Sequence, residues 1–224
     1  MNFPPHAEPG FELVYQDECL LVADKPAGLL SVPGRGPEKQ DCLSARIQAE
    51  FPDALVVHRL DMATSGLLLF ARGPDMQSRL SKMFREREIG KRYVALAAGR
   101  LTPATGEIAL PLIADWPNRP RQKVDLDIGK PSLTRYRLLD YDAENDTTLV
   151  ELEPVTGRSH QLRLHLAAIG HAIVGDSLYG GREAERLMLH ACLLSFAHPL
   201  AGRPLRLVSD PPFGTPTDAI LSPA

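Results

Sequence analysis

The chain has 224 residues, 44% of them hydrophobic and 24% charged, a composition that suits one sizeable globular domain or one domain with two lobes. Its net charge of −3 counts against a strongly basic nucleic-acid binder, and no apolar run approaches the ~20 residues of a membrane-spanning helix. The cysteines Cys19, Cys42 and Cys192 form no CxxC pair, which argues against a disulfide framework and a zinc ribbon. Because the first residues lack the pattern of a secretory signal, we expect a cytoplasmic protein.

Charge is unevenly distributed along the chain. Residues 79–92 hold six basic and two acidic side chains, whereas residues 140–153 hold six acidic side chains and no basic one. A molecule with one positive face can still bind a polyanion in spite of its overall acidity.

The first third of the chain predicts strands around one helix. Residues 1–10 are rich in proline and are predicted to form a flexible arm. Strands are expected at 11–16 and 19–26, followed by a helix that Asp41 caps. The stretch VVHRLDMATSGLLLFAR (56–72) then places a polar turn between two apolar runs, which indicates two buried strands.

The middle of the chain predicts one helix and several strands. Asp75 is expected to cap the helix. Its apolar stripe consists of Met76, Leu80, Met83 and Phe84. A strand is predicted at 92–99, hairpin-like loops at 100–130, and an antiparallel pair at 132–141 and 147–155.

The last third predicts a helix and a hairpin. Ser159 can cap a helix over 160–170 that Gly170 ends. Its apolar face is expected to hold Leu162, Leu166 and Ile169. Strands at 187–196 and 204–209 follow. Many strands with few helices out of strict alternation favour a mixed-sheet α+β fold.

Asp61 is the first candidate for chemistry, since it follows a predicted buried strand and lies beside Arg59 in a turn of small polar residues. An ionised, partly desolvated carboxylate can act as a nucleophile or a base. The alternative is a structural aspartate that accepts hydrogen bonds from the backbone near Thr64 and Ser65.

A second candidate is TGRSHQLRLH (156–165), where Arg158 stands just before a helix and can reach an anion. The alternative is a set of basic side chains on an exposed helix, Arg163 and His165 among them. A metal site of His160 and His165 is not expected, because a spacing of five does not place both on one helical face.

Two further stretches combine aromatic and basic residues. Tyr93 in GKRYVAL (90–96) is either a core residue with its hydroxyl paired or a ring that stacks on a base. DWPNRPRQKV (115–124) suits an RNA stem-loop, and its alternative is an exposed loop with incidental charge. Its candidate contacts are Trp116, Arg119, Arg121 and Lys123.

Taken together, these segments resemble the A/C/D group of RNA pseudouridine synthases, the group named for the large ribosomal RNA. HRLDMATSGLLLFAR resembles the HRLDxxTSG signature of this family. KPAGLLSVPGR, REIGKRYVAL, TGRSHQLRLH and GDSLYG match its other blocks in family order. FREREIGKRYVA and DWPNRPRQKV are similar to the subgroup with dual specificity for rRNA and tRNA.

The resemblance implies a fold and a domain organisation. We expect a pseudouridine synthase catalytic core over 11–214, a long mixed and mostly antiparallel sheet with flanking helices and a central cleft. We also expect a C-terminal tail over 215–224 and no separate N-terminal RNA-binding module. A monomer that uses no cofactor is expected, since the reaction only rearranges the atoms of its substrate.

The resemblance also implies roles for individual residues. Asp61 would attack the target nucleotide, Arg158 would pair with Asp61 and orient it, and Tyr93 would lie against the uracil ring. We hypothesise that Arg59, on the same side of its strand as Asp61, fills the space that the flipped uridine leaves or contacts phosphates. Lys91 is counted among the RNA contacts.

The expected substrates are a hairpin loop of large-subunit rRNA and the anticodon stem-loop of tRNA. One alternative is a synthase of the same group that acts on a single RNA. Another is a catalytically silent RNA-binding module or chaperone, which the joint presence of Asp61, Tyr93 and Arg158 disfavours.

Overall fold

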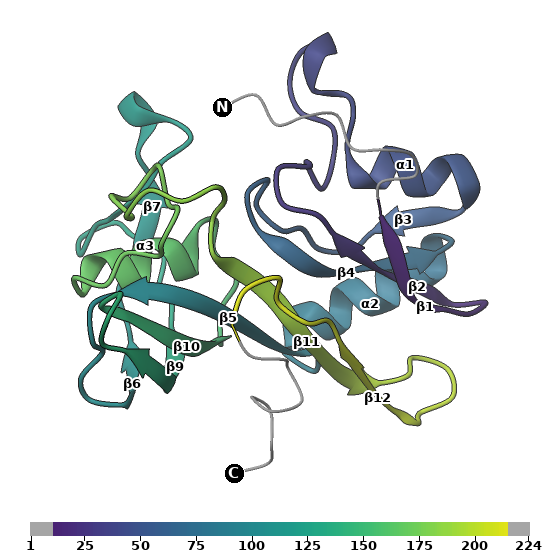
Figure 1. The fold of residues 1–224 in the computed structure, drawn as a ribbon. Coiled ribbons are helices and arrows are strands. Elements are labelled where there is room, and N and C mark those ends of the chain that lie inside the picture. The colour runs from purple at the N-terminus through teal and green to yellow at the C-terminus, as the bar shows by residue number, and fades with distance from the viewer. Residues whose placement is uncertain (1–10, 215–224) are drawn as a thin grey trace. The chain divides into compact units, whose positions relative to one another are not determined.

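The computed structural model describes residues 11–214, which divide into two compact units (Figure 1). The first unit comprises residues 11–91 and 191–210, and the second comprises 92–190 and 211–214. The predicted arm and tail lie outside the described residues. No helix within 11–214 is long and apolar enough to cross a membrane.

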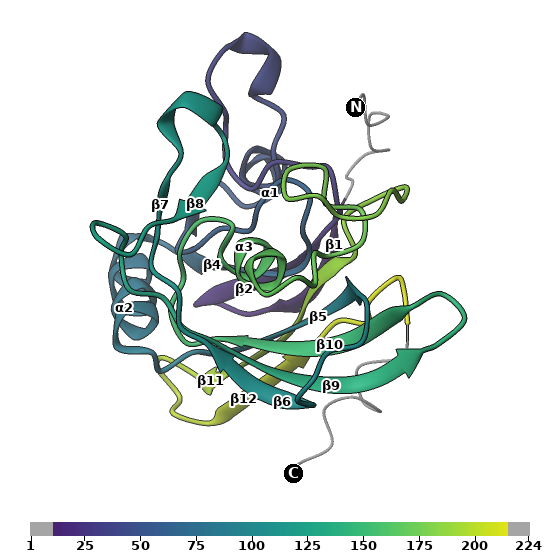
Figure 2. The same cartoon turned by 90° about the vertical axis from the view of Figure 1, so that its left-hand side faces the viewer.

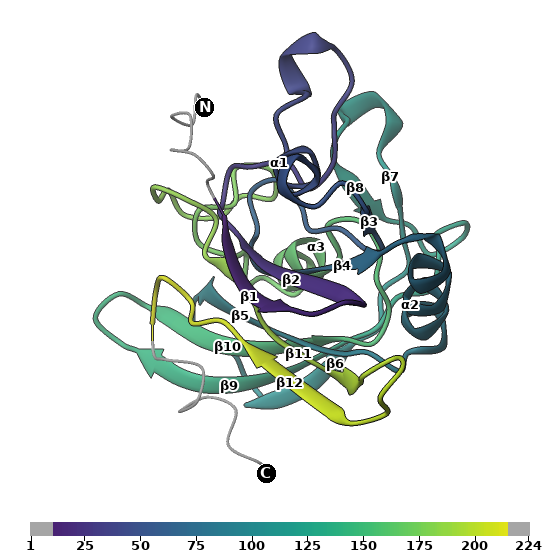
Figure 3. The same ribbon diagram turned by 90° about the vertical axis from the view of Figure 1, so that its right-hand side faces the viewer.

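The first unit is an antiparallel sheet with two helices. Its elements are β1 (Glu12–Gln16), β2 (Leu20–Lys25), α1 (Leu43–Glu50), β3 (Ala54–Val56), β4 (Ser65–Arg72), α2 (Pro74–Glu86), β11 (Leu189–Ala197) and β12 (Pro204–Val208), with a short 3₁₀ helix at Pro37–Lys39. The strand order is β1-β2-β4-β11, with β3 paired to β4 and β12 to β11. Figure 3 shows β1, β2 and β4 side by side, with α2 along β4.

The core of this unit forms because apolar runs lie in its central strands. Residues 65–71 of β4 are all buried, so the second of the two strands predicted within 56–72 is confirmed. The first is wrong, because β3 ends at Val56 and residues 57–64 form a loop. Met76, Leu80 and Met83 of α2 pack into the same cluster as Val22 and Leu69, so the predicted apolar stripe is confirmed.

Two predicted helix caps in the first unit are wrong. Cys42 is the N-cap of α1, and its Sγ accepts the Ala45 N–H at 3.4 Å, whereas Asp41 forms an ion pair with Arg46. Gly73 is the N-cap of α2, because Pro74 occupies the first helical position, where its missing N–H costs nothing. Asp75 lies inside the first turn instead, where its charge suits the helix dipole.

The second unit is an antiparallel sheet, a separate hairpin and one helix. Its elements are β5 (Gly90–Ala98), β6 (Thr105–Ile108), β7 (Leu112–Ala114), β8 (Gln122–Val124), β9 (Thr134–Asp142), β10 (Thr147–Pro154) and α3 (Gln161–Ala168), with a 3₁₀ helix at Trp116–Asn118. The sheet order is β5-β10-β9-β6, and β7 pairs with β8 alone. Figure 2 shows α3 lying beside β9 and β10, which it contacts.

The helix α3 differs from its predicted form. Its N-cap is His160, with a left-handed backbone at φ 54°, and not Ser159. All residues from Gln161 to Leu166 are buried, so the helix has no exposed polar face. Ile169 closes the helix and is 38% exposed, whereas Leu162 and Leu166 are buried as predicted. The α+β fold with a largely antiparallel sheet is confirmed, and the central cleft stays a prediction.

Candidate active site

Asp61 lies in the loop 57–64 that connects β3 to β4. Its carbonyl accepts the Thr64 N–H at 3.1 Å, which closes a tight turn. Leu60 before it is buried, Asp61 is partly buried, and Met62 after it is 43% exposed. The loop therefore places Asp61 between a residue with a buried side chain and one with an exposed side chain.

Lys25, at the end of β2, fixes this loop through its backbone. The side chain is fully buried, and its Nζ donates to the carbonyls of Pro26 at 2.8 Å, Leu29 at 2.7 Å and Met62 at 3.1 Å. An ammonium group has three donors, and a buried one is stable only when its donors are bonded, a role that these carbonyls fill here. The Met62 carbonyl also accepts the Gly28 N–H at 2.8 Å, so two donors fix the residue that follows Asp61.

Ser31 fixes the other side of Asp61. Its buried Oγ donates to the Leu60 carbonyl at 2.7 Å and accepts the Leu60 N–H at 3.1 Å. Both neighbours of Asp61 are thus tied to the segment 25–31. Sequence reasoning missed Lys25 and Ser31, and the available signal was a lysine at the end of a strand that begins with four apolar residues.

His58 supports the loop as a neutral acceptor. Its Nε2 accepts the Leu69 N–H at 2.9 Å, and its ring lies 4.5 Å from that of Phe84. Burial, helped by the nearby Lys91 cation, lowers the pKa of His58 to about 3. Lys91 has its ammonium 5.9 Å from the Phe84 ring, and burial lowers the pKa of Lys91.

The strand geometry predicted for Arg59 is wrong. β3 ends at Val56, so Arg59 and Asp61 stand in a loop, where strand alternation does not apply. The Arg59 side chain is exposed. Its contact with RNA stays a prediction that rests on this exposure and on its place two residues before Asp61.

In the second unit, Tyr93 lies on the face of the sheet that α3 covers. Tyr93 is paired with Leu152 of β10, which is paired with Tyr136 of β9. Alternation along β9 then puts Thr134 on the same face, and Thr134 Oγ1 bonds His165 of α3 at 2.9 Å.

Arg158 precedes α3 and is exposed. Its backbone N–H donates to Gln161 Oε1 at 3.0 Å, and its Nε donates to the Pro131 carbonyl at 3.2 Å. Gln161 is buried and its Nε2 donates to the Leu133 carbonyl at 3.0 Å, so the backbone at Arg158 is held from within. This geometry fits the predicted position of an arginine that reaches an anion.

The alternative of an exposed basic helix is wrong. Arg163 is buried and forms two hydrogen bonds with Asp176, at 2.7 and 2.8 Å. His165 is fully buried and bonds Ser132 and the Leu110 carbonyl, both at 3.0 Å. These side chains hold α3 in place and are not available to a ligand at the surface.

The β7–β8 hairpin exposes the aromatic and basic residues that the sequence singled out. Trp116 is 67% exposed, and the Arg119 guanidinium lies 3.1 Å from the centre of its ring. Arg121 is exposed, and Lys123 forms an ion pair with Asp125 at 3.0 Å. Stacked aromatic and cationic groups of this kind can contact both bases and phosphates.

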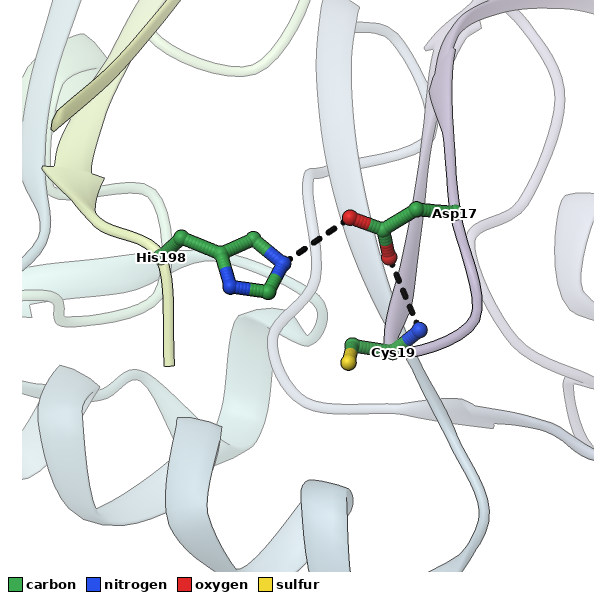
Figure 4. Close-up of side chains that lie close together, drawn as sticks. All are labelled: Asp17, Cys19 and His198. Atoms are coloured by element: carbon green, nitrogen blue, oxygen red, sulfur yellow. Dashed lines mark hydrogen bonds and ion pairs between the residues drawn. The ribbon is translucent and has the colours of Figure 1, made fainter. Parts of the chain in front are cut away.

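One group of metal-ligating side chains within 11–214 consists of Asp17, Cys19 and His198 (Figure 4). Asp17 Oδ2 accepts the Tyr15 hydroxyl at 2.6 Å and His198 Nε2 at 2.8 Å, and its Oδ1 accepts the Cys19 N–H at 2.8 Å. His198 Nδ1 accepts backbone N–H groups of the β11–β12 turn, at 3.0 and 3.2 Å. These hydrogen bonds join the β1–β2 turn to the β11–β12 turn within the first unit.

The comparisons with known proteins agree with this fold. A family model described as RNA pseudouridylate synthase matches residues 19–168. The chain therefore belongs to the RNA pseudouridylate synthase family, the isomerases that convert uridine in RNA to pseudouridine.

Two bacterial relatives and one solved structure are similar to this chain over most of its length. The dual-specificity RNA pseudouridine synthase RluA of Escherichia coli (strain K12) is 50% identical over 205 residues, 90% of this chain and 93% of the relative. RluA of Vibrio cholerae is 50% identical over 202 residues, 88% of this chain and 82% of the relative. The human RNA pseudouridylate synthase domain containing 1 superposes with a TM-score of 0.77 at 29% identity, over 94% of this chain and 87% of that one.

Proposed function

We propose that this synthase acts on two substrates, a hairpin loop of large-subunit rRNA and the anticodon stem-loop of tRNA. Support comes from the two bacterial relatives, whose name states dual specificity and which match nearly the whole chain. Within the chain, the assignment of Asp61 as the catalytic residue depends most on one observation. Both of its neighbours are held by hydrogen bonds to their backbone, while Asp61 itself is partly accessible. Because both RNAs are found with the translation machinery, we expect the protein to act in the cytoplasm. We also expect it to act as a monomer.

The proposed chemistry assigns the bond-breaking step to Asp61. Its carboxylate attacks the target nucleotide, at C6 of the uracil or at C1′ of the ribose, and the bond between N1 and C1′ breaks. The base rotates and C5 bonds to C1′. The bond from Asp61 then breaks, by displacement when it was formed at C1′ and by elimination when it was formed at C6, which frees the carboxylate. The proton on C5 leaves to solvent, and N1 gains a proton. The product has the composition of the substrate, so no redox or group-transfer partner enters the balance.

The remaining site residues are assigned to substrate binding. Tyr93 supplies a ring against the uracil, which must leave its stack at a cost of a few kcal/mol. Arg158 supplies an exposed guanidinium on a fixed backbone. Arg59, Lys91 and the hairpin residues Trp116, Arg119, Arg121 and Lys123 are assigned to the surrounding RNA.

The test uses transcribed stem-loops that carry tritium at C5 of uridine. We expect release of tritium from both the rRNA hairpin and the tRNA anticodon stem-loop. The Asp61→Asn variant should release none, while it still binds RNA. The matched control is Asp75→Asn, which changes an exposed aspartate in the first turn of α2 and should keep full activity.

Three outcomes would contradict parts of the proposal. Undiminished release by Asp61→Asn would remove Asp61 as the nucleophile. Release from one stem-loop alone would indicate a single-substrate synthase. Binding without release in the unaltered protein would favour a silent RNA-binding module.

A further inference from the structure

We propose that Tyr179 is a positioning residue that sets the placement of the β7–β8 hairpin against the start of α3. The inference rests on the proposed function, because it takes the hairpin as an RNA contact and Arg158 as a site residue. All residues involved belong to the second unit.

The Tyr179 hydroxyl joins two segments. It accepts the backbone N–H of Gln122 in β8 at 2.8 Å, and it shares a hydrogen bond with Nδ1 of His160 at 2.8 Å. Gln122 directly follows Arg121, and His160 stands two residues after Arg158. One oxygen atom therefore connects the neighbourhoods of two predicted site cations.

The loop that carries Tyr179 is itself fixed. Asp176 is buried, accepts the Tyr179 N–H at 3.2 Å and holds Arg163 with both carboxylate oxygens. The Gly181 N–H donates to the Asp176 carbonyl at 2.9 Å, and a Cβ on Gly181 would clash with the Ile173 carbonyl oxygen. A rigid support of this kind allows the hydroxyl to act as a fixed point.

The partner at the start of α3 has an unusual backbone. His160 has φ 54°, a left-handed conformation that residues with a Cβ rarely adopt. Such conformations persist when surrounding bonds hold them, and they concentrate at functional sites. The ring of His160 also lies edge-on to that of Tyr179, with 5.7 Å between the centroids.

The ring of Tyr179 adds a second connection to the hairpin. The guanidinium of Arg121 lies 5.7 Å from its centroid, and that of Arg163 lies 5.4 Å away. Both distances are within the range of a cation–π attraction. The tyrosine thus contacts the hairpin through its backbone, by way of Gln122, and through the side chain of Arg121.

The test is Tyr179→Phe, which keeps the ring and removes the hydroxyl. We expect KM for the tRNA anticodon stem-loop to rise about tenfold with kcat changed by less than about threefold, since the hydrogen bonds lost serve placement and not chemistry. Hydrogen exchange at the Gln122 amide should accelerate about tenfold, because this amide loses its acceptor. The matched control is Tyr141→Phe, which removes a hydroxyl bonded to Asp146 in an exposed turn and should leave KM unchanged.

The readouts separate this inference from the proposed function. A lower melting temperature with unchanged KM would show a merely structural role and overturn the inference. Unchanged exchange at Gln122 would overturn it whether or not the protein modifies RNA. If the unaltered protein releases no tritium from either stem-loop, the proposed function fails, and the exchange measurement still decides the role of Tyr179.

Discussion

The Asp61 turn and the β7–β8 hairpin are both assigned to the same reaction, yet they are built in opposite ways. In the turn, buried side chains of Lys25 and Ser31 bond the backbone on each side of Asp61. In the hairpin, Trp116 and Arg121 are exposed, and the 3₁₀ turn between the strands is closed by its own backbone bonds. The hydroxyl of Tyr179 bonds the hairpin backbone at Gln122, outside this turn, and leaves both side chains exposed.

The difference follows from what each region has to do. A nucleophile must be held within a fraction of an ångström of its target, so the protein commits buried polar groups to its backbone. Cations and aromatic rings that contact RNA must remain accessible, and they gain from exposure. Changes in the turn should therefore affect stability and kcat, whereas changes in the hairpin should affect KM.

The largest effect is expected for Lys25→Met, which keeps an unbranched apolar stem and removes the buried ammonium. The Pro26 and Leu29 carbonyls lose a donor, so we expect a loss of about 3 kcal/mol in the free energy of unfolding. A loss of this size lowers Tm by roughly 6–12 °C in a chain of this length. Thermal denaturation checks it, with Lys39→Met, an exposed lysine of the same unit, as the control.

At a temperature where Lys25→Met is folded, kcat should fall more than KM rises. An unchanged Tm would show that the Asp61 turn does not depend on its buried clamp, and the contrast with the hairpin would then disappear.

His58→Gln tests the turn by pH. The pKa of His58 is about 3 in the folded protein, below its ordinary value of 6.5, so the unfolded chain binds a proton first as pH falls. Stability should therefore be complete above about pH 6.5 and decrease below it, by up to roughly 1.4 kcal/mol for each pH unit. Glutamine offers the Leu69 N–H an acceptor but does not titrate, so the variant should lose stability less steeply.

The measurement is urea denaturation at intervals from pH 7 to pH 5. His165, whose pKa burial also lowers, contributes in the same direction and is present in both proteins. Equal slopes for the two proteins would contradict the buried, neutral state of His58.

Trp116→Ala tests the hairpin. Stacking of a base on an aromatic ring contributes ~1–3 kcal/mol, so we expect KM for the stem-loops to rise about tenfold or more. Because the side chain is 67% exposed, the free energy of unfolding should change by less than about 0.5 kcal/mol. The control is Leu200→Ala, an apolar residue of the β11–β12 turn that is 59% exposed and should leave KM unchanged. A large fall in Tm with an unchanged KM would contradict this prediction, because Trp116 would then serve stability and not RNA binding.

The fold could be predicted where a single run of residues determines an element. Hydrophobic pattern alone predicts the burial of residues 65–71 and of the stripe formed by Met76, Leu80 and Met83. Helix caps are harder to predict, because several polar residues near the start of a helix can each act as the N-cap. In α2, Pro74 occupies the first helical position, so Gly73 is the N-cap.

The site could be predicted only in part. Asp61 and the hairpin residues stand in recognisable stretches, but the roles of Asp61, Tyr93 and Arg158 came from the family resemblance and stay predictions. The lysine at the end of β2 is visible in the sequence, but its bonds to backbone carbonyls are not revealed by any side-chain pattern. The buried position of Arg163 could not be predicted, because its partner Asp176 lies outside the helix, thirteen residues further on.

The smallest effect is expected for Arg121→Ala, which removes one exposed cation from the hairpin. A protein with a net charge of −3 must bind RNA through local basic groups, and each phosphate contact releases counterions. Removing one contact should weaken binding severalfold and reduce the slope of log Kd against log salt concentration by about one. Fluorescence anisotropy with a labelled anticodon stem-loop between 50 and 200 mM salt, roughly the range over which such slopes are read, measures both. The control is Arg203→Ala, in the β11–β12 turn, which should keep the original slope. An equal change of slope in both variants would mean that RNA responds to the charge of the whole molecule. The hairpin would then have no special part in RNA binding.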